Sequence, residues 1–444
     1  MAAYVLDMND SELRIARIGG EAHDVVAQSM GFALIEDRVI RFGQAALQLF
    51  RLHPRQVNNQ FWNRLSTDPL PSRGPNTANH ADLVYRHFQE LVRDGAITGD
   101  DEFVIATPGT TTNEQLGLLL GIAAETGVTV SGLVDAALVA SIVHPAPKRL
   151  LHVDVSLHRA VVTELTRTDG LARQRVDEIA ELGLTNLLDA WVNVIADRFV
   201  RDARFDPLSI ASTDQQVYNQ LYAWLQDPAR PRDFSIDIDH RGALRHTEMN
   251  IETLIDRVTP RYRMLDRHAE AATVFLSHRA ARLPGLTEHL APRAARVVLL
   301  DRMDLFRGVA AHQSLIRSDP QSLRLITRLP VLPVMGLERD VLPSPTTLRR
   351  DPERPTHVLF GSDAVAIGQH LVLGRDGFPE LPGDFPSEAV QIVVNTNAMQ
   401  LKLQDGTQVT LDGVATHSGA TLAKGAVLEV AGARFQLIRT RSSP

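Results

Sequence analysis

The pattern of secondary structure changes once along this 444-residue chain, at about residue 330. Before that point, apolar runs of strand length alternate with segments of helical period, such as residues 81–92 and 113–126. Strands that alternate with helices predict an α/β domain whose sheet is largely parallel and covered by helices. After residue 330, short apolar strands are separated by turns that contain glycine. This second pattern predicts a small all-β sandwich of about 90 residues.

Prolines mark the junction between the two patterns: Pro330, Pro333, Pro343, Pro345, Pro352 and Pro355. A segment rich in proline favours an extended conformation over a compact one. We therefore predict an α/β domain over residues 1–328, a linker over 329–355 and a β-sandwich over 356–444.

Composition excludes several classes of protein. Net charge is −7 with both signs spread along the chain, so there is no basic stripe of the kind that binds nucleic acid. The chain has no cysteine, which excludes disulfides and thiolate metal sites. The longest apolar stretch, residues 116–124, is far shorter than a membrane span, and the first ten residues do not resemble a signal peptide. These features predict a cytoplasmic protein that does not insert into a membrane.

Local patterns in the α/β part predict its elements. A hairpin should occupy the first 20 residues, with a polar turn at Asn9, Asp10 and Ser11. The other predicted strands are 32–35 with 39–42, 103–106, 129–130, 150–155, 234–238 and 274–276, and the other predicted helices are 133–143, 187–199 and 215–225.

Several short segments of residues 1–318 follow one another in a distinctive order. They are Asp7 at a strand end, Phe103–Pro108 with Thr112–Gln115, Leu133–Ala137, His152-Val153-Asp154, Leu182-Gly183 with Leu187 and Phe199, Arg282-Leu283-Pro284, and Arg307–Ala311. In this order they resemble the actin and DnaK-type heat-shock chaperone ATPase superfamily. The resemblance implies two lobes, each with a ribonuclease-H-like mixed sheet, on either side of a central cleft.

The same resemblance implies a nucleotide site. Its residues would be Asp7, Ser11, Asp154, Ser156, Gly183 and Arg282. Asp7 and Asp154 would hold the metal of MgATP, since paired carboxylates at strand ends suit Mg²⁺. The alternative for both aspartates is a structural role in turns or helix caps. No spacing among the 16 histidines predicts any other metal site.

The glycines that a phosphate loop needs are absent from these segments. Only glycine leaves room for backbone N–H groups to approach phosphate oxygens closely. The family's first loop reads Asn9-Asp10-Ser11 here, its second reads Ser156-Leu157-His158 and then Arg159, and its adenosine glycines are His278-Arg279. Asn63 stands where the chaperones have a lysine. We therefore predict a degenerate, non-catalytic ATPase fold with no catalytic residues and no required cofactor.

The last 90 residues resemble a forkhead-associated (FHA) domain. The segments that carry this resemblance are Leu373-Gly374-Arg375, 410–413 and 422–428. It implies recognition of phosphothreonine by Arg375 and Ser387 through charge-assisted hydrogen bonds. However, Val390 stands at the family's histidine position, and the Asn-Gly loop is missing. These departures favour a protein-contact module that does not depend on phosphate.

The sequence thus predicts a non-catalytic scaffold or assembly factor. Both domains would contact protein partners, in keeping with a multi-component assembly. The alternative is a switch or filament protein that binds MgATP through altered loops and carries a phosphothreonine-reading FHA domain. The missing glycines favour the scaffold over the ATP-dependent switch.

Overall fold

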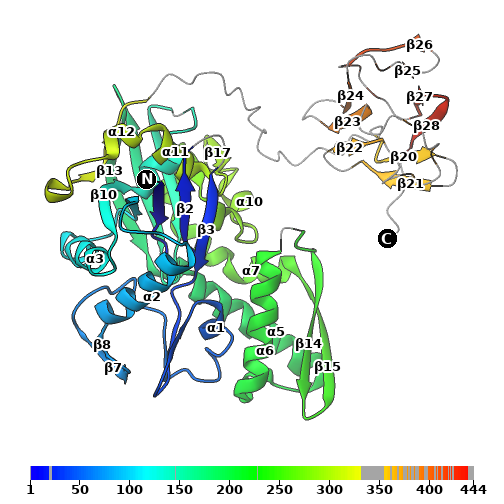
Figure 1. Ribbon diagram of the computed structural model, residues 1–444. Coiled ribbons are helices and arrows are strands. Elements are labelled where there is room, and N and C mark those ends of the chain that lie inside the picture. The colour runs from blue at the N-terminus through cyan, green and yellow to red at the C-terminus, as the bar shows by residue number, and fades with distance from the viewer. Residues whose placement is uncertain are drawn as a thin grey trace. The chain divides into compact units, whose positions relative to one another are not determined.

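The computed structural model describes residues 2–19, 23–145, 147–227 and 229–331, and a set of shorter stretches between 355 and 438 (Figure 1). These stretches are 355–360, 363–367, 370–373, 378, 381, 385, 390–394, 399–404, 407, 409–411, 414–418, 420, 422 and 425–438. The chain divides into two compact units, Met1–Gly336 and Leu337–Pro444. The protein is mixed α/β, and the described part of the second unit consists of strands and loops.

Two six-stranded sheets form the centre of the first unit. The first sheet has the order β18-β10-β9-β1-β2-β3 and the second has the order β17-β16-β11-β12-β13-β19. The first contains β1 (Ala3–Asp7), β2 (Leu13–Ile18), β3 (Asp24–Ser29), β9 (Glu102–Thr107), β10 (Thr129–Asp135) and β18 (Leu325–Ile326). The second contains β11 (Arg149–Val155), β12 (Ala160–Arg167), β13 (Leu171–Ile179), β16 (Thr273–Leu276), β17 (Arg296–Leu299) and β19 (Arg328–Leu329).

The two sheets repeat one arrangement of five strands. In each, the first three strands form an antiparallel meander, and the next two strands run parallel to the first strand. β1 and β11 therefore occupy the same central position in their sheets. Parallel neighbours end at the same edge of a sheet. In each sheet, the residues that follow the first strand and its two parallel neighbours therefore gather at one edge.

Helices and small sheets complete this unit. The helices are α1 (Gln44–Leu47), α2 (His80–Asp94), α3 (Asn113–Glu125), α4 (Ala136–Ser141), α5 (Leu184–Ala203), α6 (Ala211–Gln226), α7 (Ile251–Tyr262), α8 (Asp266–Ala269), α9 (His278–Ala281), α10 (Leu286–Leu290), α11 (Asp304–Ala311) and α12 (Gln313–Ile316). The small sheets are β4 (Ala33–Ile35) with β5 (Ile40–Phe42) and β6 (Val57–Asn58), β7 (Pro69–Gly74) with β8 (Thr77–Asn79), and the hairpin of β14 (Asp233–His240) and β15 (Ala243–Asn250). Among the described helices, none combines the length and apolar character needed to cross a membrane.

One strand was not predicted, and one predicted helix starts too early. The predicted strands 32–35 and 39–42 are present as β4 and β5, but β3, the third strand of the first sheet, was missed. The segment 133–135, expected as the start of a helix, belongs to β10, because it pairs with β9 and β18. Asp135 then caps α4 by accepting a hydrogen bond from the backbone N–H of Leu138. Strand pairing thus outweighed the local helical pattern.

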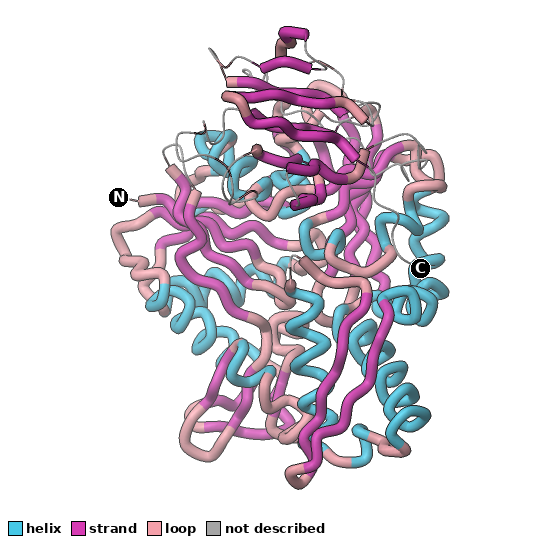
Figure 2. Tube along the Cα trace, turned by 90° about the vertical axis from the view of Figure 1, so that its right-hand side faces the viewer, coloured by secondary structure: helices cyan, strands magenta, loops and turns pink. Residues whose placement is uncertain are grey.

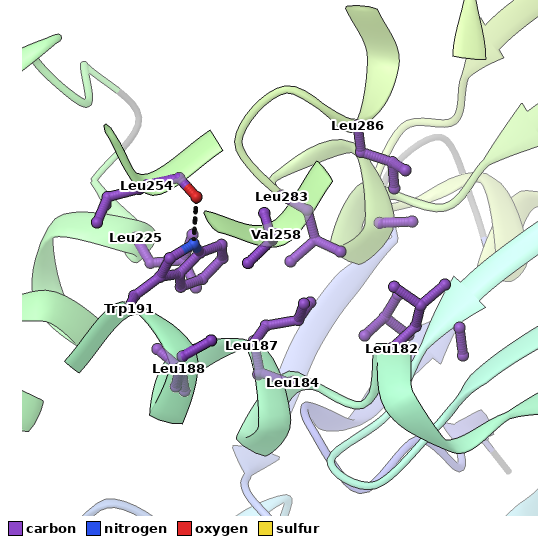
Figure 3. Close-up of a cluster of buried hydrophobic side chains, with 14 of the residues drawn as sticks. Leu182, Leu184, Leu187, Leu188, Trp191, Leu225, Leu254, Val258, Leu283 and Leu286 are labelled. Atoms are coloured by element: carbon purple, nitrogen blue, oxygen red, sulfur yellow. Dashed lines mark hydrogen bonds between the residues drawn. The ribbon is translucent and has the colours of Figure 1, made fainter. Parts of the chain in front are cut away.

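An apolar cluster of leucines around Trp191 supports the start of α5 (Figure 3). Leu184, Leu187 and Leu188 of α5 pack here with residues of α6, α7 and α10. The indole N–H of Trp191 donates to the backbone oxygen of Leu254 at 2.9 Å, so its one polar atom is satisfied inside the core. This packing holds the start of α5 and the segment after α9 in fixed positions next to the ends of the central strands.

The second unit contains two antiparallel sheets that share one hydrophobic core. One has the order β21-β20-β28-β27-β25-β26 and the other the order β22-β23-β24. Their strands are β20 (His357–Phe360), β21 (Asp363–Ala366), β22 (His370–Val372), β23 (Val390–Val394), β24 (Met399–Leu403), β25 (Val409–Leu411), β26 (Val414–Ala415), β27 (Val427–Val430) and β28 (Ala433–Ile438). Arg375 and Ser387 lie outside the described residues.

The packing of α11 on α4 generates a stability prediction. A Cβ atom on Gly308 would lie 1.9 Å from the backbone oxygen of Val139, so Gly308→Ala forces the two helices apart. We expect the free energy of unfolding to fall by about 1–3 kcal/mol. Gly121→Ala in α3 is the matched control, because a Cβ there meets no atom within 4 Å. That change should raise stability by about 0.5–1 kcal/mol. Urea denaturation of both variants measures this, and equal stabilities would contradict the helix contact.

Candidate functional site

The central strands of the two sheets end in carboxylates that contact one arginine. Asp7 is the last residue of β1, Asp154 lies near the end of β11, and Arg279 is in α9, directly after β16. The Nη1 of Arg279 donates to Oδ2 of Asp7 at 2.8 Å. Its Nη2 and Nε donate to the two carboxylate oxygens of Asp154 at 2.8 and 3.0 Å. Arg279 thus joins the first sheet to the second through ion pairs.

A second guanidinium completes the surroundings of Asp7. The Nη2 of Arg14, on β2, donates to Oδ2 of Asp7 at 2.7 Å. Its Nη1 donates to the backbone oxygen of Arg302 at 2.6 Å, and the guanidinium lies 5.0 Å from the ring centre of Phe306. Arg14 is 1% exposed, so it is a core residue despite its charge.

Burial and ion pairing act in opposite directions on these groups. Burial alone would raise the pKa of the Asp7 carboxyl, but the guanidiniums of Arg279 and Arg14 lower it below its ordinary value. Burial opposes ionisation of Asp154 as well, and Arg279 again lowers the pKa. The two carboxylates in turn hold the pKa of Arg279 well above its ordinary value, against the effect of burial. All three groups are therefore charged at neutral pH, and each depends on the others.

The two loops that follow β1 and β11 bind each other directly. Nδ2 of Asn9 donates to Oδ2 of Asp154 at 2.9 Å, and the hydroxyl of Ser11 donates to the backbone oxygen of Val155 at 3.0 Å. The carboxylate of Asp10 accepts from the backbone N–H of Leu157 at 2.7 Å. The backbone N–H of Ser11 donates to Oδ1 of Asn9 at 3.0 Å. The backbone N–H groups of Ser11 and Leu157 are thus taken by protein acceptors and not left open to an anion.

Gly183 fits the loop after β11 closely against the start of α5. A Cβ on Gly183 would lie 2.3 Å from the carbonyl carbon of His158. The backbone N–H groups of Leu184 and Thr185 donate to the oxygens of Ser156 and Leu157 at 3.0 and 2.9 Å. The glycine is therefore required by contact between two parts of the protein backbone.

Around this centre the charges balance without a ligand. Three carboxylates, Asp7, Glu12 and Asp154, stand beside three guanidiniums, Arg14, Arg279 and Arg282. Burial would raise the pKa of Glu12, but a hydrogen bond from His278 at 2.6 Å and its other neighbours lower it to about 2. Burial and the charge of Arg279 lower the pKa of His278 to about 4, so this imidazole is neutral at pH 7. The carboxyl of Asp10 is also buried near this cluster, and burial raises its pKa although the charge of Arg279 acts in the opposite direction.

A cavity of about 330 Å³ lies beside the cluster of charges. Its apolar wall includes Met30, Tyr222 and Leu283, and Arg279 and Arg282 are among its polar residues. Nη1 of Arg282 donates to the side-chain oxygen of Gln226 at 2.9 Å across this wall. The cavity is large enough for several water molecules or a small organic group.

The structure brings most of the predicted site residues together. Asp7 and Asp154 lie at the ends of β1 and β11, Ser11 and Ser156 lie in the loops that follow, Gly183 packs against His158 of the second loop, and Arg282 lines the cavity. Both aspartates have structural partners: guanidiniums bind the two carboxylates, and Asp154 also accepts from the backbone N–H of Val155 and from the hydroxyl of Ser277, which caps α9.

The neighbouring pair His158 and Arg159 also has protein partners. Nε2 of His158 contacts the backbone oxygen of Asn59 at 2.8 Å, and Arg159 pairs with Glu178 at 2.9 Å. Both side chains are thus engaged within the protein. They contribute to holding the loop after β11 in place.

Arg279 and Arg14 were missed by sequence reasoning. Arg279 was noted only as a residue that replaces a glycine, and Arg14 stands in an ordinary strand pattern. A usable signal existed, since an arginine directly after a buried strand has to find carboxylates if it turns inward. The sequence offered Asp7 and Asp154 at the ends of two other strands.

The residues at this site do not fit MgATP. The guanidinium of Arg279 lies between the two carboxylates that would hold the metal, at hydrogen-bonding distance from both. The carboxylate of Asp10 lies where the loop would need to present N–H groups to an anion. Among the residues that the structure describes, no group of three or more histidine, aspartate or glutamate side chains could hold a metal ion.

Comparisons with known proteins add no family assignment. No family model matches the chain, and no curated protein matches it. The function has to be argued from the geometry of the site.

Removal of the Arg279 charge should destabilise the protein strongly. Arg279→Met leaves Asp7 and Asp154 buried beside each other without their shared cation. Breaking a buried ion pair from one side typically costs about 3–5 kcal/mol. Arg198→Met is a matched control, because its pair with Asp202 is on the surface, where solvent screens the charges, so its loss should change stability much less. Denaturant unfolding measures both, and adding Asp7→Asn with Asp154→Asn to Arg279→Met should restore part of the loss.

The same ion pairs predict how stability depends on pH. The folded-state pKa values of Asp7, Glu12 and Asp154 are all lowered, so their contribution is complete above the unfolded-state values near pH 4. Stability should fall as the pH drops below about 4 towards 2. In Arg279→Met, Asp7 and Asp154 lose their shared partner. The difference in free energy of unfolding between the natural protein and this variant should therefore decrease as the pH falls. A difference that stays constant from pH 7 to pH 3 would contradict the assignment of these ion pairs.

Proposed function

We propose that the first unit is a degenerate actin/DnaK-type ATPase fold that acts as a non-catalytic scaffold or assembly factor. One observation carries this proposal: Arg279 lies between Asp7 and Asp154, in the place that a metal and phosphates would need. A scaffold of this kind needs no nucleotide to hold its two sheets together.

The repeated topology supports the resemblance to that superfamily. Two sheets with the same five-strand arrangement are what a pair of ribonuclease-H-like lobes would have. Asp7 and Asp154 stand at equivalent positions of the two repeats, and they face each other through Arg279. The close approach of α4 and α11 at Gly308 joins the segments that the resemblance assigns to the connecting helices.

The charge balance favours a closed protein over a nucleotide-binding one. A polyphosphate placed beside the existing carboxylates would add negative charge to a cluster whose ion pairs are already satisfied. Displacing Arg279 to make room would leave a buried cation without partners, and that costs several kcal/mol. These terms oppose the alternative of an MgATP-dependent switch or filament protein.

For the second unit we propose an FHA-like sandwich that makes protein contacts. Its two antiparallel sheets around a common core support a sandwich. Val390 is fully buried in that core, so this position cannot supply a phosphate donor. Partner binding by this unit would then rest on surface shape and not on phosphothreonine.

Titration with nucleotide tests the proposal. Occupancy of a site at 100 times its dissociation constant would raise the free energy of unfolding by about 2.7 kcal/mol. We expect millimolar MgATP and MgADP to shift the melting temperature by no more than a control mixture of magnesium and inorganic phosphate does. Calorimetric titration should show no heat of binding. A saturable heat with a matching thermal shift would overturn the proposal and favour the ATP-dependent switch.

A further inference from the structure

We propose that the outer edge of β15 is a docking site for an extended, basic segment of a partner protein. The partner would add a strand to the hairpin of β14 and β15. This inference deepens the proposed scaffold function, because it names a surface through which a partner can bind.

The first step concerns the edge of β14, which is closed. The side-chain amides of Gln216 and Gln220, on α6, bond to this edge as a neighbouring strand would. Gln216 donates to the backbone oxygen of Asp239 at 3.0 Å and accepts from its N–H at 2.8 Å. Gln220 makes the same pair of bonds with Asp237, at 2.6 and 3.0 Å. Figure 1 shows α6 next to β14.

The edge of β15 has no such cover. Residues that face each other across an antiparallel pair alternate between those that bond to each other and those that point away. The backbone N–H and C=O groups of Asp237 and Asp239 point to α6. The backbone groups of the residues opposite them, His246 and Leu244, therefore point away from β14, to the other edge of the hairpin. Within the described chain, no hydrogen bond joins the backbone N–H or C=O of Leu244, His246 or Glu248 to another element. Figure 2 shows the hairpin in front of the helices of the same unit.

Exposure agrees with an open edge. Leu244 is 73% exposed, and the side chains of His246 and Glu248 are 51% and 86% exposed. The alternate residues of the hairpin, such as Ile238 and Met249, are buried against the rest of the unit. The hairpin is therefore held firmly on one face, and the described residues of the first unit leave its outer face and one edge uncovered. An open strand edge binds extended segments through main-chain hydrogen bonds.

Charge selects the partner. The outward-facing side chains of the hairpin are Asp233, Ser235, Asp237, Asp239, Leu244, His246, Glu248 and Asn250. Four of these eight are carboxylates, and none is lysine or arginine. A second copy paired edge to edge would extend the sheet with four more carboxylates on the same face, which like charges oppose. A strand with lysine or arginine at alternate positions would place one cation beside Glu248 of β15, and the three aspartates of β14 would lie one strand further away on the same face.

Labelled peptides test strand addition on the full-length protein. The probe is an eight-residue peptide of alternating lysine and valine, followed by fluorescence anisotropy at physiological salt. Two further peptides carry N-methyl groups, one on every lysine and the other on every valine. Only one edge of an added strand faces β15, so one methylated peptide should lose at least about tenfold in affinity and the other should not. Equal binding of both methylated peptides, or no binding of the unmodified peptide, would overturn the proposal.

Proline variants locate the edge. His246→Pro removes an outward N–H and should lower affinity about tenfold, whereas His246→Ala keeps the N–H and should bind within twofold of the natural protein. Ser235→Pro is the matched control, because its N–H points outward from β14. If His246→Pro fails to fold, hydrogen exchange on the natural protein replaces it, with peptide-dependent protection expected at Leu244 and Glu248. Unchanged affinity of folded His246→Pro, or no protection at those amides, would refute the site. Nucleotide binding is measured separately, so either proposal can fail alone.

Discussion

The ion pairs of Arg279 determine how the two sheets of the first unit meet. A guanidinium that is 8% exposed needs carboxylates beside it to offset the cost of burying its charge, and Asp7 and Asp154 supply them from two different sheets. The same three groups decide what the edge of the sheets can accommodate. The guanidinium of Arg279 is part of the chain, so it is present beside the two carboxylates whether or not a ligand is in solution. The loops on either side can then bond to each other, as Asn9, Ser11 and Asp10 do.

The glycines of this unit follow the same logic. Gly183 and Gly308 stand where one stretch of backbone approaches another so closely that a Cβ would collide with it. The loops after β1 and β11 instead carry larger residues, because side chains and not an external anion fill the space between them. Gly183 and Gly308 are therefore required by contacts within the protein, and the phosphate-binding glycines are absent from loops that bind each other.

In the function that we propose, binding takes place at the surface of the protein. The cluster of charges holds the two sheets together, and the hairpin of β14 and β15 presents an acidic outer face. The two glutamines of α6 close one edge of that hairpin and leave the other available. A rigid interior and an open strand edge are compatible features of a protein that assembles other proteins.

The sequence by itself determined the α/β class, the central strands and the predicted helices 81–92 and 113–126, because each of these follows from local periodicity. The meeting of Asp7 with Asp154, which belong to two different sheets, was implied by the family resemblance and not by a local pattern. The strand at 133–135, the third strand β3 and the role of Arg279 were decided by the tertiary structure. Leu133 pairs with neighbours from distant parts of the chain, and β3 is an edge strand with little alternation. Arg279 is separated from Asp7 by 272 residues, so no local pattern could show that the residue in place of a glycine supplies the missing cation. Long-range electrostatics became visible only when the fold brought these charges within hydrogen-bonding distance.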